Sequence, residues 1–297
     1  MSYVTRRFVC LIFMIGVSAL FLPANAQHFG NGATFVDDGN SVIFHSFSLG
    51  NGNIVELDIA TGAVRSITED GRRDRWPSSD PSGKRIVFIS QRTPPWKIYT
   101  VNRDGSDLRL LTEEEGAHLG ATWSPDGSRI AYSKQDLDAE SFRADLWVMK
   151  ANGIHKTKVI EGAMWPFWDR LRNQVFFTTV LADGNVALGS YDVASKARAV
   201  LTNGTLNATG AGITPDGRHI YVSAVSGGER TLHRIDRDGT NLVNLGIPAQ
   251  QDSSPQVSPD GGSLLYGYNE GEGTEVYLLD LETKQLRNLS RELKVAD

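Results

Sequence analysis

The chain has 297 residues, of which 40% are hydrophobic and 22% charged, and its 30 Lys and Arg against 35 Asp and Glu give a net charge of -5. These values are typical of a soluble globular protein, and the mild acidity argues against a nucleic-acid binder, which would normally show a basic face or stripe. The 30 Gly and 11 Pro are too few for a collagenous or disordered chain, so we expect a folded protein with many tight turns.

Residues 1–26 have the pattern of a secretory signal peptide. Arg6 and Arg7 precede an apolar run over residues 8–22, and Ala24-Asn25-Ala26 matches the motif for cleavage after Ala26. The run is shorter than the roughly 18 to 20 apolar residues that a membrane-spanning helix needs. We therefore predict a periplasmic or secreted protein with no membrane span after cleavage. The one cysteine, Cys10, would leave with the signal, so the mature chain is expected to have no disulfide.

A four-residue turn repeats along the rest of the chain. Its copies are Asp80-Pro81-Ser82-Gly83, Ser124-Pro125-Asp126-Gly127, Thr214-Pro215-Asp216-Gly217 and Ser258-Pro259-Asp260-Gly261, with a weaker Asp37-Asp38-Gly39. Gly39, Gly83 and Gly127 are 44 residues apart, as are Gly217 and Gly261. Two periods separate Gly127 from Gly217, so a sixth, degenerate copy is expected at 168–172.

Each unit has the pattern of four short strands. In the third unit we expect strands over 121–124, 129–133, 145–149 and 157–160. Pro and Gly set the first turn, and Asn152-Gly153 or its counterparts form the second. The fourth strand often ends in an aliphatic residue followed by a hydroxyl, as in Leu111-Thr112 and Leu289-Ser290.

Six such units predict an all-β, six-bladed β-propeller of four-stranded antiparallel blades, closed in sequence order, as one domain over 27–297. A solenoid or two stacked sandwiches are the alternatives. We expect the ring to close by packing of the first unit on the last, because the seven residues after Ser290 leave little chain to donate. A strand swap is the alternative closure.

The string W-S-P-D-G-x-R-I-A-Y-S at 123–133, with D-L-W-V-M at 145–149, resembles the WD-like repeat of TolB-type propellers. The resemblance covers the mature chain and implies a component of the Tol-Pal envelope system. TolB also has an amino-terminal α/β domain. This chain is expected to lack that domain, because its first repeat begins shortly after Gln27.

Consecutive turns of a propeller blade alternate between the two faces of the disc. The Pro-Asp-Gly turns and the second turns therefore share one face, called here the turn face. The loops between second and third strands and between units lie on the other, called here the variable face, which is the better candidate for binding. Its candidate partner-binding residues are Asp74, Arg75, Arg92, Trp96, His118, Trp165 and Asp252. A solvated rim of charges is the alternative interpretation.

These observations favour an exported, monomeric scaffold that binds another envelope or periplasmic protein on the variable face, without cofactor or metal. An enzyme is not expected, because the chain has neither a G-x-S-x-G nor an H-E-x-x-H motif. The alternative is a carbohydrate-binding or polyuronate-cleaving propeller that uses His118 with Asp74, Asp252 and Trp96. By strand position, only His45 and His118 of the six His point to the variable face. Asp136, Asp138 and Glu140 are expected to form a solvated acidic loop rather than a Ca²⁺ site.

Overall fold

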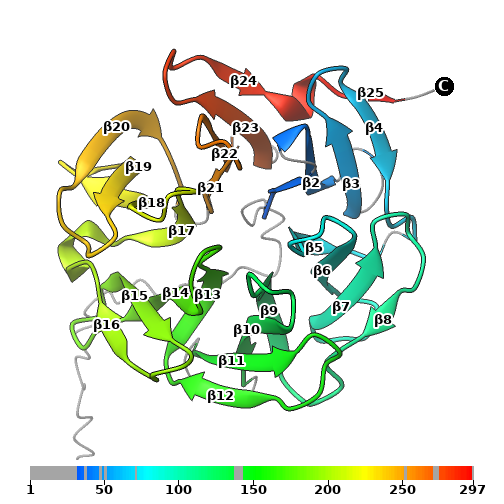
Figure 1. Cartoon of the computed structure of the whole chain (residues 1–297), viewed down its shortest axis with the longest axis horizontal. Helices are drawn as coiled ribbons and strands as arrows, with labels where there is room; N and C mark the ends of the chain where they lie inside the picture. The colour runs from blue at the N-terminus through cyan, green and yellow to red at the C-terminus, as the bar shows by residue number, and fades with distance from the viewer. Residues whose placement is uncertain are drawn as a thin grey trace, which may run out of the picture.

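The computed structural model describes residues 32–36, 39–46, 49, 52–70, 72–136, 143–250, 253–269 and 274–295. Within them, six β-sheets stand around a central axis as the blades of a propeller (Figure 1). Each blade consists of four consecutive antiparallel strands, so the predicted all-β, six-bladed fold in sequence order is confirmed. The expected signal peptide at 1–26 lies outside the described residues.

The blades follow one another along the chain, each from its inner strand to its outer strand. The first three comprise β1 (Thr34–Val36), β2 (Ser41–Ser46), β3 (Asn53–Asp58), β4 (Ala63–Ser66); β5 (Arg75–Ser79), β6 (Arg85–Ser90), β7 (Lys97–Asn102), β8 (Arg109–Leu110); and β9 (Ala117–Trp123), β10 (Arg129–Gln135), β11 (Ala144–Lys150), β12 (Thr157–Ile160). The last three comprise β13 (Ala163–Trp168), β14 (Gln174–Val180), β15 (Val186–Asp192), β16 (Arg198–Val200); β17 (Thr209–Ile213), β18 (His219–Ser226), β19 (Glu229–Asp236), β20 (Val243–Pro248); and β21 (Gln256–Val257), β22 (Ser263–Asn269), β23 (Thr274–Asp280), β24 (Leu286–Asn288). Two short 3-10 helices, η2 (Gly204–Leu206) and η3 (Leu289–Arg291), and a last strand, β25 (Lys294–Val295), complete the described elements. In this part of the chain, no helix is long and apolar enough to cross a membrane.

The repeated turns join the first two strands of their blades. Their glycines all lie in the left-handed region, with φ of 96° at Gly39, 67° at Gly83, 67° at Gly127, 69° at Gly217 and 80° at Gly261. In the third blade, the Asp126 carboxylate accepts hydrogen bonds from the Ser124 hydroxyl at 2.6 Å and from the Ser128 N–H at 3.0 Å. These bonds lower the pKa of Asp126 to about 2. The carboxylate therefore holds the turn in its ionised form.

The degenerate sixth copy is present where the period predicts it, between β13 and β14. Its Asp169 carboxylate accepts the Leu171 N–H at 2.8 Å, as other turn acids accept N–H groups two residues on. The Pro and Gly of the other copies are replaced here, and the turn differs as a result: the Gln174 N–H donates to the Arg172 carbonyl at 2.8 Å, whereas in the third blade the Gly127 N–H donates to the Ser124 carbonyl at 2.9 Å.

The hydroxyl at the end of the fourth strand has a structural role in four blades. It accepts a backbone N–H of the third strand at 2.9 Å, and the pairs are Thr68 with Ile54, Thr112 with Ile98, Thr202 with Leu188, and Ser290 with Val276. In each blade this N–H lies one residue beyond the last pair of the ladder to the fourth strand. The side chain thus satisfies a backbone donor that the ladder leaves unpaired.

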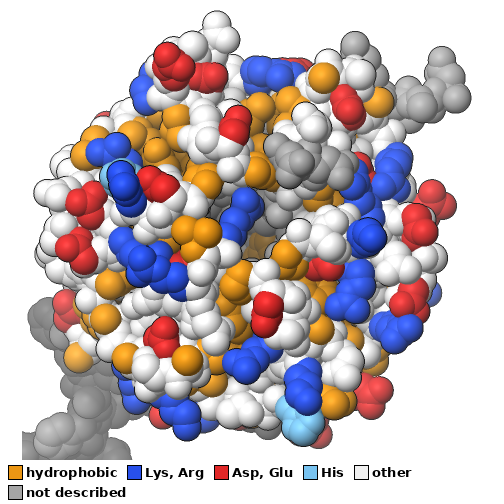
Figure 2. All heavy atoms as spheres, in the orientation of Figure 1, with side chains coloured by type: hydrophobic (Ala, Val, Ile, Leu, Met, Phe, Trp, Pro, Cys, Tyr) orange, Lys and Arg blue, Asp and Glu red, His pale blue; other side chains and the backbone are white. Residues whose placement is uncertain are grey.

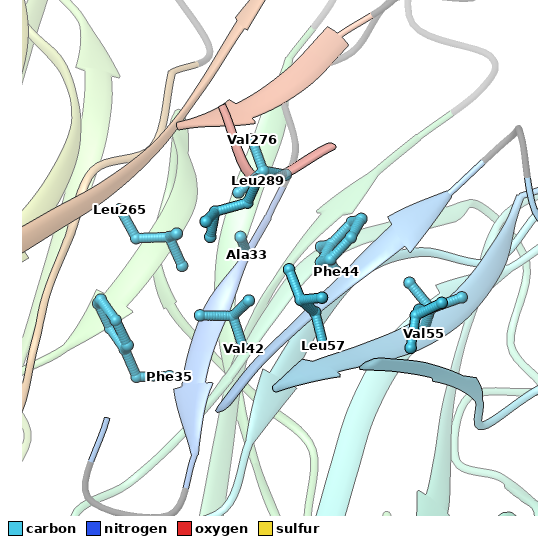
Figure 3. Close-up of a cluster of buried hydrophobic side chains, with 10 residues drawn as sticks. Ala33, Phe35, Val42, Phe44, Val55, Leu57, Leu265, Val276 and Leu289 are labelled. Carbon is cyan, nitrogen blue, oxygen red and sulfur yellow. The ribbon is translucent and has the colours of Figure 1, made fainter. Parts of the chain in front are cut away.

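The first and last blades pack together and close the ring. Leu265 and Val276 of the sixth blade share a buried cluster with Phe35 and Phe44 of the first (Figure 3). On the turn face, a methyl group added at Gly39 would lie 3.3 Å from Cδ of Pro259. The ring therefore closes by packing, as expected from the repeat order.

The chain end adds one feature that was not expected. β25 pairs in parallel with β4 and becomes the fifth strand of the first blade, with Lys294 opposite Ala63 (Figure 1). Seven residues follow Ser290, and two of them suffice to form this strand, contrary to the expectation that they leave little chain to donate. The outer edge of the first blade is covered as a result.

Candidate binding site around the central channel

The inner strands of all six blades surround a central channel of about 530 Å³. It runs between the strand starts on the variable face and the first turns on the turn face. Figure 2 shows the opening at the centre of the disc, with hydrophobic side chains around it. A volume of this size is typical of ligand-binding cavities.

Five of the six inner strands have a residue in the left-handed region at or near their start. These residues are Trp76 with φ 50°, Gly120 with 53°, Trp165 with 50°, Gly210 with 60° and Ser254 with 40°. In four blades the pairing register shifts at this point, so the residue forms a β-bulge. For a bulky residue this conformation costs roughly 1 to 3 kcal/mol. Trp76 and Trp165 are therefore held in strained backbone at the variable-face mouth.

Glycines of the neighbouring blades make room for these residues. A methyl group added at Gly32 would lie 2.8 Å from Cα of Trp76, and one added at Gly120 would lie 3.5 Å from Cδ1 of Trp165. The third such pair is Gly210, where a methyl group would lie 3.0 Å from Cα of Ser254. Blades one, three and five thus supply the glycine, and blades two, four and six supply the larger residue.

This alternation is also visible in the sequence, but only when each blade is compared with the one two blades further along the chain rather than with the next blade. The odd blades read Gly32-Ala33, Gly120-Ala121 and Gly210-Ala211, whereas the even blades read Trp76-Pro77, Trp165-Pro166 and Ser254-Pro255. Trp165 was a candidate from the sequence, but Trp76 was not selected. A search at twice the blade period would have found both.

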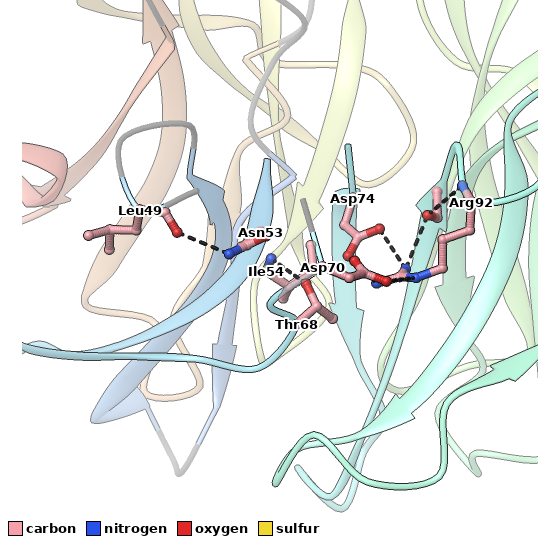
Figure 4. Close-up of polar contacts among 8 residues, drawn as sticks. Leu49, Asn53, Ile54, Thr68, Asp70, Asp74 and Arg92 are labelled. Atoms are coloured by element: carbon pink, nitrogen blue, oxygen red, sulfur yellow. Dashed lines mark hydrogen bonds and ion pairs between the residues drawn. The ribbon is translucent and has the colours of Figure 1, made fainter. Parts of the chain in front are cut away.

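A buried ion-pair network lies beside the mouth (Figure 4). Arg92 binds Asp74 through Nη1–Oδ1 at 2.6 Å and Nη2–Oδ2 at 2.9 Å. It also binds Asp70 through Nε–Oδ2 at 2.7 Å and Nη2–Oδ1 at 2.6 Å. The Asp74 residue is 0% exposed and the Arg92 side chain 11%. The alternative of a solvated rim of charges therefore does not apply to Asp74 and Arg92, because each neutralises the other inside the blade.

Arg75 and Trp96 form a second contact of the same face. Arg75 is buried, and its guanidinium lies 5.4 Å from the centre of the Trp96 ring. Trp96 is half-buried against the core of the second and third blades. Arg75 is therefore also an internal residue rather than a rim charge, while part of Trp96 remains accessible.

His118 is fully buried at the start of β9. Its ring centre lies 5.8 Å from that of Tyr132, its Nε2 lies 3.8 Å from a Glu114 carboxylate oxygen, and neither ring nitrogen has a hydrogen-bond partner among the described residues. Burial, with the nearby charge of Lys97, lowers the pKa of His118 to about 4. Burial and Arg75 lower the pKa of His45 to about 3. Both imidazoles are therefore neutral near pH 7.

The described residues contain no group of three or more His, Cys, Asp or Glu side chains that could hold a metal ion. Asp252, Asp138 and Glu140 lie outside the described part of the chain. Of the candidate residues that are described, the structure gathers Asp74, Arg75, Arg92, Trp96, His118 and Trp165 near the variable face of blades two to four. Asp74, Arg75 and His118 are buried, and Arg92 is held in an internal ion pair. Of the six residues, only Trp96 and Trp165 are therefore partly exposed and free of such a pair.

The fold and the repeat have counterparts among known proteins. Residues 24–172 match the sequence profile described as the TolB beta propeller domain. The Tol-Pal system protein TolB of Francisella tularensis is 25% identical over 218 residues, which cover 70% of this chain and 49% of that protein. This chain thus spans about half the length of that curated relative.

Two solved structures share the architecture at low identity. TolB from Acinetobacter baumannii matches with a TM-score of 0.72 at 16% identity, over 84% of this chain and 63% of that one. The oligogalacturonate lyase of Vibrio parahaemolyticus matches with a TM-score of 0.59 at 12% identity, over 86% of this chain and 79% of that one. Similarity at these identities shows a common fold and nothing about a common activity.

Proposed function

This chain belongs to the TolB β-propeller family, and from that membership we propose that it is a binding protein of the cell envelope that holds another protein on its variable face. The observation that carries the proposal is the pair Trp76 and Trp165, two half-buried indoles in left-handed backbone at the channel mouth. Strained residues persist only where the surroundings enforce them, and they gather at functional sites. Partly exposed Trp side chains are also frequent anchors at protein interfaces.

Internal contacts brace the mouth in the structure without a partner. Arg92 joins Asp70 and Asp74 across the start of the second blade, and Trp96 is packed against Arg75. Glycines of the preceding blades fix the space for both indoles. A preorganised surface loses little conformational entropy on binding, which raises affinity. In this proposal Asp74, Arg75, Arg92 and His118 support the mouth from within, and Trp76, Trp96 and Trp165 contact the partner.

The proposal includes export by the amino-terminal segment, cleavage after Ala26 and a location in the periplasm or outside the cell. Support comes from the sequence pattern of residues 1–26 and from the envelope system named for the Francisella relative. The protein is proposed to act as a monomer, as a binding module rather than an enzyme, and without a cofactor.

Site-specific photo-crosslinking tests the proposed face. One variant carries a photoreactive phenylalanine analogue at Trp165, and a matched variant carries it at Ile154, which is 50% exposed in a second turn of the turn face. Each is irradiated with envelope extract of the source organism, and the products are identified by mass spectrometry. We expect one saturable protein adduct from position 165 and none from position 154.

The purified partner then permits a quantitative test by calorimetry. Trp165→Ala should weaken binding at least tenfold, as expected for an interface anchor, whereas Leu242→Ala on the turn face should leave the affinity unchanged. Equal adducts from both positions, or full affinity in Trp165→Ala with the fold intact, would contradict the proposed face.

A further inference from the structure

The degenerate turn of the fourth blade places a cation where the other blades have proline. By the repeat, Arg170 takes the position of Pro81, Pro125, Pro215 and Pro259. Pro81, Pro125 and Pro259 line the turn-face end of the central channel, and Arg170 lines it with them. Figure 2 shows a Lys or Arg side chain within the central opening. Arg170 is the one basic residue among the described residues that line this channel.

The acidic residue next to Arg170 in the sequence and the acidic residue in the channel lining both have hydrogen-bond or ion-pair partners of their own. Asp169 is 0% exposed and its carboxylate binds Nη2 of Arg237 at 2.5 Å. Asp80, the one acid among the described lining residues, accepts the N–H groups of Lys84 at 2.9 Å and Arg85 at 3.0 Å. Both carboxylates are thus engaged within their own turns or with another arginine. Neither neutralises Arg170.

Arg170 has no hydrogen bond or ion pair with any residue that the structure describes. Arg170 is exposed at the channel lining, and the protein around its guanidinium lowers the pKa of that group by desolvation. The channel therefore contains one positive charge without a counter-charge. A charge inside a channel is screened less than one on the open surface.

A second donor at the same end of the channel lacks a partner. Trp168 lines the channel and is 2% exposed, and its indole N–H makes no hydrogen bond within the described chain. The equivalent residue of the third blade, Trp123, donates its indole N–H to the Ser78 carbonyl at 3.2 Å. An unpaired buried donor is unfavourable, so the Trp168 N–H beside the cavity would gain from an acceptor that enters it.

From these two donors we propose that the turn-face end of the channel is a binding site for a small organic monocarboxylate. The guanidinium of Arg170 pairs with the carboxylate in a bidentate ion pair, and the indole N–H of Trp168 donates to a remaining lone pair. One uncompensated positive charge matches one negative charge, which favours a monoanion over phosphate or sulfate.

The channel walls define the rest of the ligand. Phe167 and Trp165 line the same channel with apolar ring surface, and Ser78, Thr122 and other hydroxyl-bearing residues line it with them. A ligand body with an aromatic or aliphatic face gains from contact with the rings, and the hydroxyl groups of the walls can bond to a few polar groups on its other side. The ligand class is therefore a carboxylate on a partly apolar body small enough for about 530 Å³.

Phenylacetate is the first probe, with phenylacetamide, galacturonate and sulfate as comparisons. Binding to the mature chain is measured by calorimetry and by quenching of tryptophan fluorescence, since four of the Trp residues line the channel. We expect saturable binding of phenylacetate and weaker or no binding of the other three. Equal binding of the neutral amide, tighter binding of galacturonate or sulfate, or no saturable binding of phenylacetate would each overturn the proposal.

Variants identify the residues that bind. Arg170→Gln should weaken phenylacetate binding about tenfold or more, as expected for loss of a charged hydrogen-bond partner. Arg170→Pro, which restores the residue of the other turns, should do the same. Trp168→Phe should weaken it less. Arg172→Gln is the matched control, because Arg172 lies two residues away and lines a separate surface hollow.

Unchanged affinity in both Arg170 variants, with melting temperatures close to that of the parent, would overturn the site. This inference goes beyond the partner binding proposed above, and the two can fail separately. Trp165→Ala tests the variable face with the protein partner, whereas Arg170→Gln tests the opposite end with the carboxylate. Arg170→Gln should leave the partner's affinity unchanged.

Discussion

Arg92 binds both carboxylate oxygens of Asp74, with nitrogen–oxygen distances of 2.6 and 2.9 Å, inside the second blade. The two residues are 18 positions apart, one before β5 and the other after β6. Their pairing fixes the geometry of the channel mouth near Trp76. The pair also allows two charged residues, which the sequence alone would place on the surface, to lie inside the blade.

Removal of one partner from this pair should destabilise the fold. Asp74→Ala leaves Arg92 buried without its inner carboxylate, and we expect a loss of about 3 to 5 kcal/mol in the free energy of unfolding. Asp70→Ala is the control, because the Asp70 side chain is 46% exposed, and it should lose about 1 kcal/mol or less. Urea unfolding monitored by circular dichroism measures both. Equal losses would show that burial of Asp74 does not decide the effect.

A second prediction concerns Gly239 in the second turn of the fifth blade. A methyl group added there would lie 1.9 Å from the Leu201 carbonyl oxygen of the fourth blade, and φ is 89°. Gly239→Ala should therefore cost more than about 3 kcal/mol, because rigid backbone must move. Gly228 has nearly the same φ, 88°, but nothing within 4 Å of the added methyl group. Gly228→Ala should lose only about 1 to 2 kcal/mol, from backbone strain alone.

The difference between these two glycine variants separates contact between blades from local strain. It is measured as a difference in denaturant midpoint at constant slope. If Gly228→Ala were as destabilising as Gly239→Ala, the close approach of the two blades would not explain the glycine.

The hydroxyl at the end of the second blade should stabilise the fold through its hydrogen bond. Thr112→Val keeps the shape of the side chain but removes the acceptor of the Ile98 N–H, at 2.9 Å in a buried position. We expect a loss of about 1 to 3 kcal/mol, because the buried donor is left unpaired. Thr157→Val on the exposed part of β12 should change the free energy of unfolding by less than about 0.5 kcal/mol. A neutral Thr112→Val would show that water or a relaxed backbone satisfies the donor.

His118 should make stability depend on pH in the acid range. Burial lowers its pKa to about 4 in the fold, whereas the unfolded chain takes up the proton below about pH 6.5. The unfolded state thus binds more protons between these values, so stability is fully present above pH 6.5 and falls as the pH drops toward 4. The loss attributable to His118 at pH 4 is about 3 kcal/mol.

His118→Asn should reduce the slope by about one proton, whatever its effect on stability at pH 7, and His45, whose pKa burial lowers to about 3, should account for part of the slope that remains. The control is His155→Asn, because His155 is exposed in the second turn of the third blade. Urea unfolding at several values between pH 7.5 and 4.5 gives the slope for each protein. A slope that stays the same in His118→Asn would show that other groups titrate in this range.

The blade count, the strand order and the turns could be predicted from the sequence, because each depends on residues close together in the chain. The strand predicted at 157–160 is β12 (Thr157–Ile160), and the degenerate copy at 168–172 joins β13 to β14. Pro and Gly in the turns act on the φ angles of their own backbone, and strand alternation repeats every two residues. A period of about 44 residues multiplies these local signals six times.

Only the tertiary structure shows which charged side chains have an ion-pair partner and which do not. Nothing in the sequence distinguishes Asp74 and Arg92 from exposed charged residues. Only the short distances between their side chains in the structure show that they pair. The same holds for Arg170, whose neighbour Asp169 binds Arg237, 68 positions away. It also holds for β25, which meets β4 only because the ring brings both chain ends to one blade. Local sequence encodes backbone conformation, but burial and charge pairing depend on contacts between distant segments, which exist only after the blades have closed into a ring.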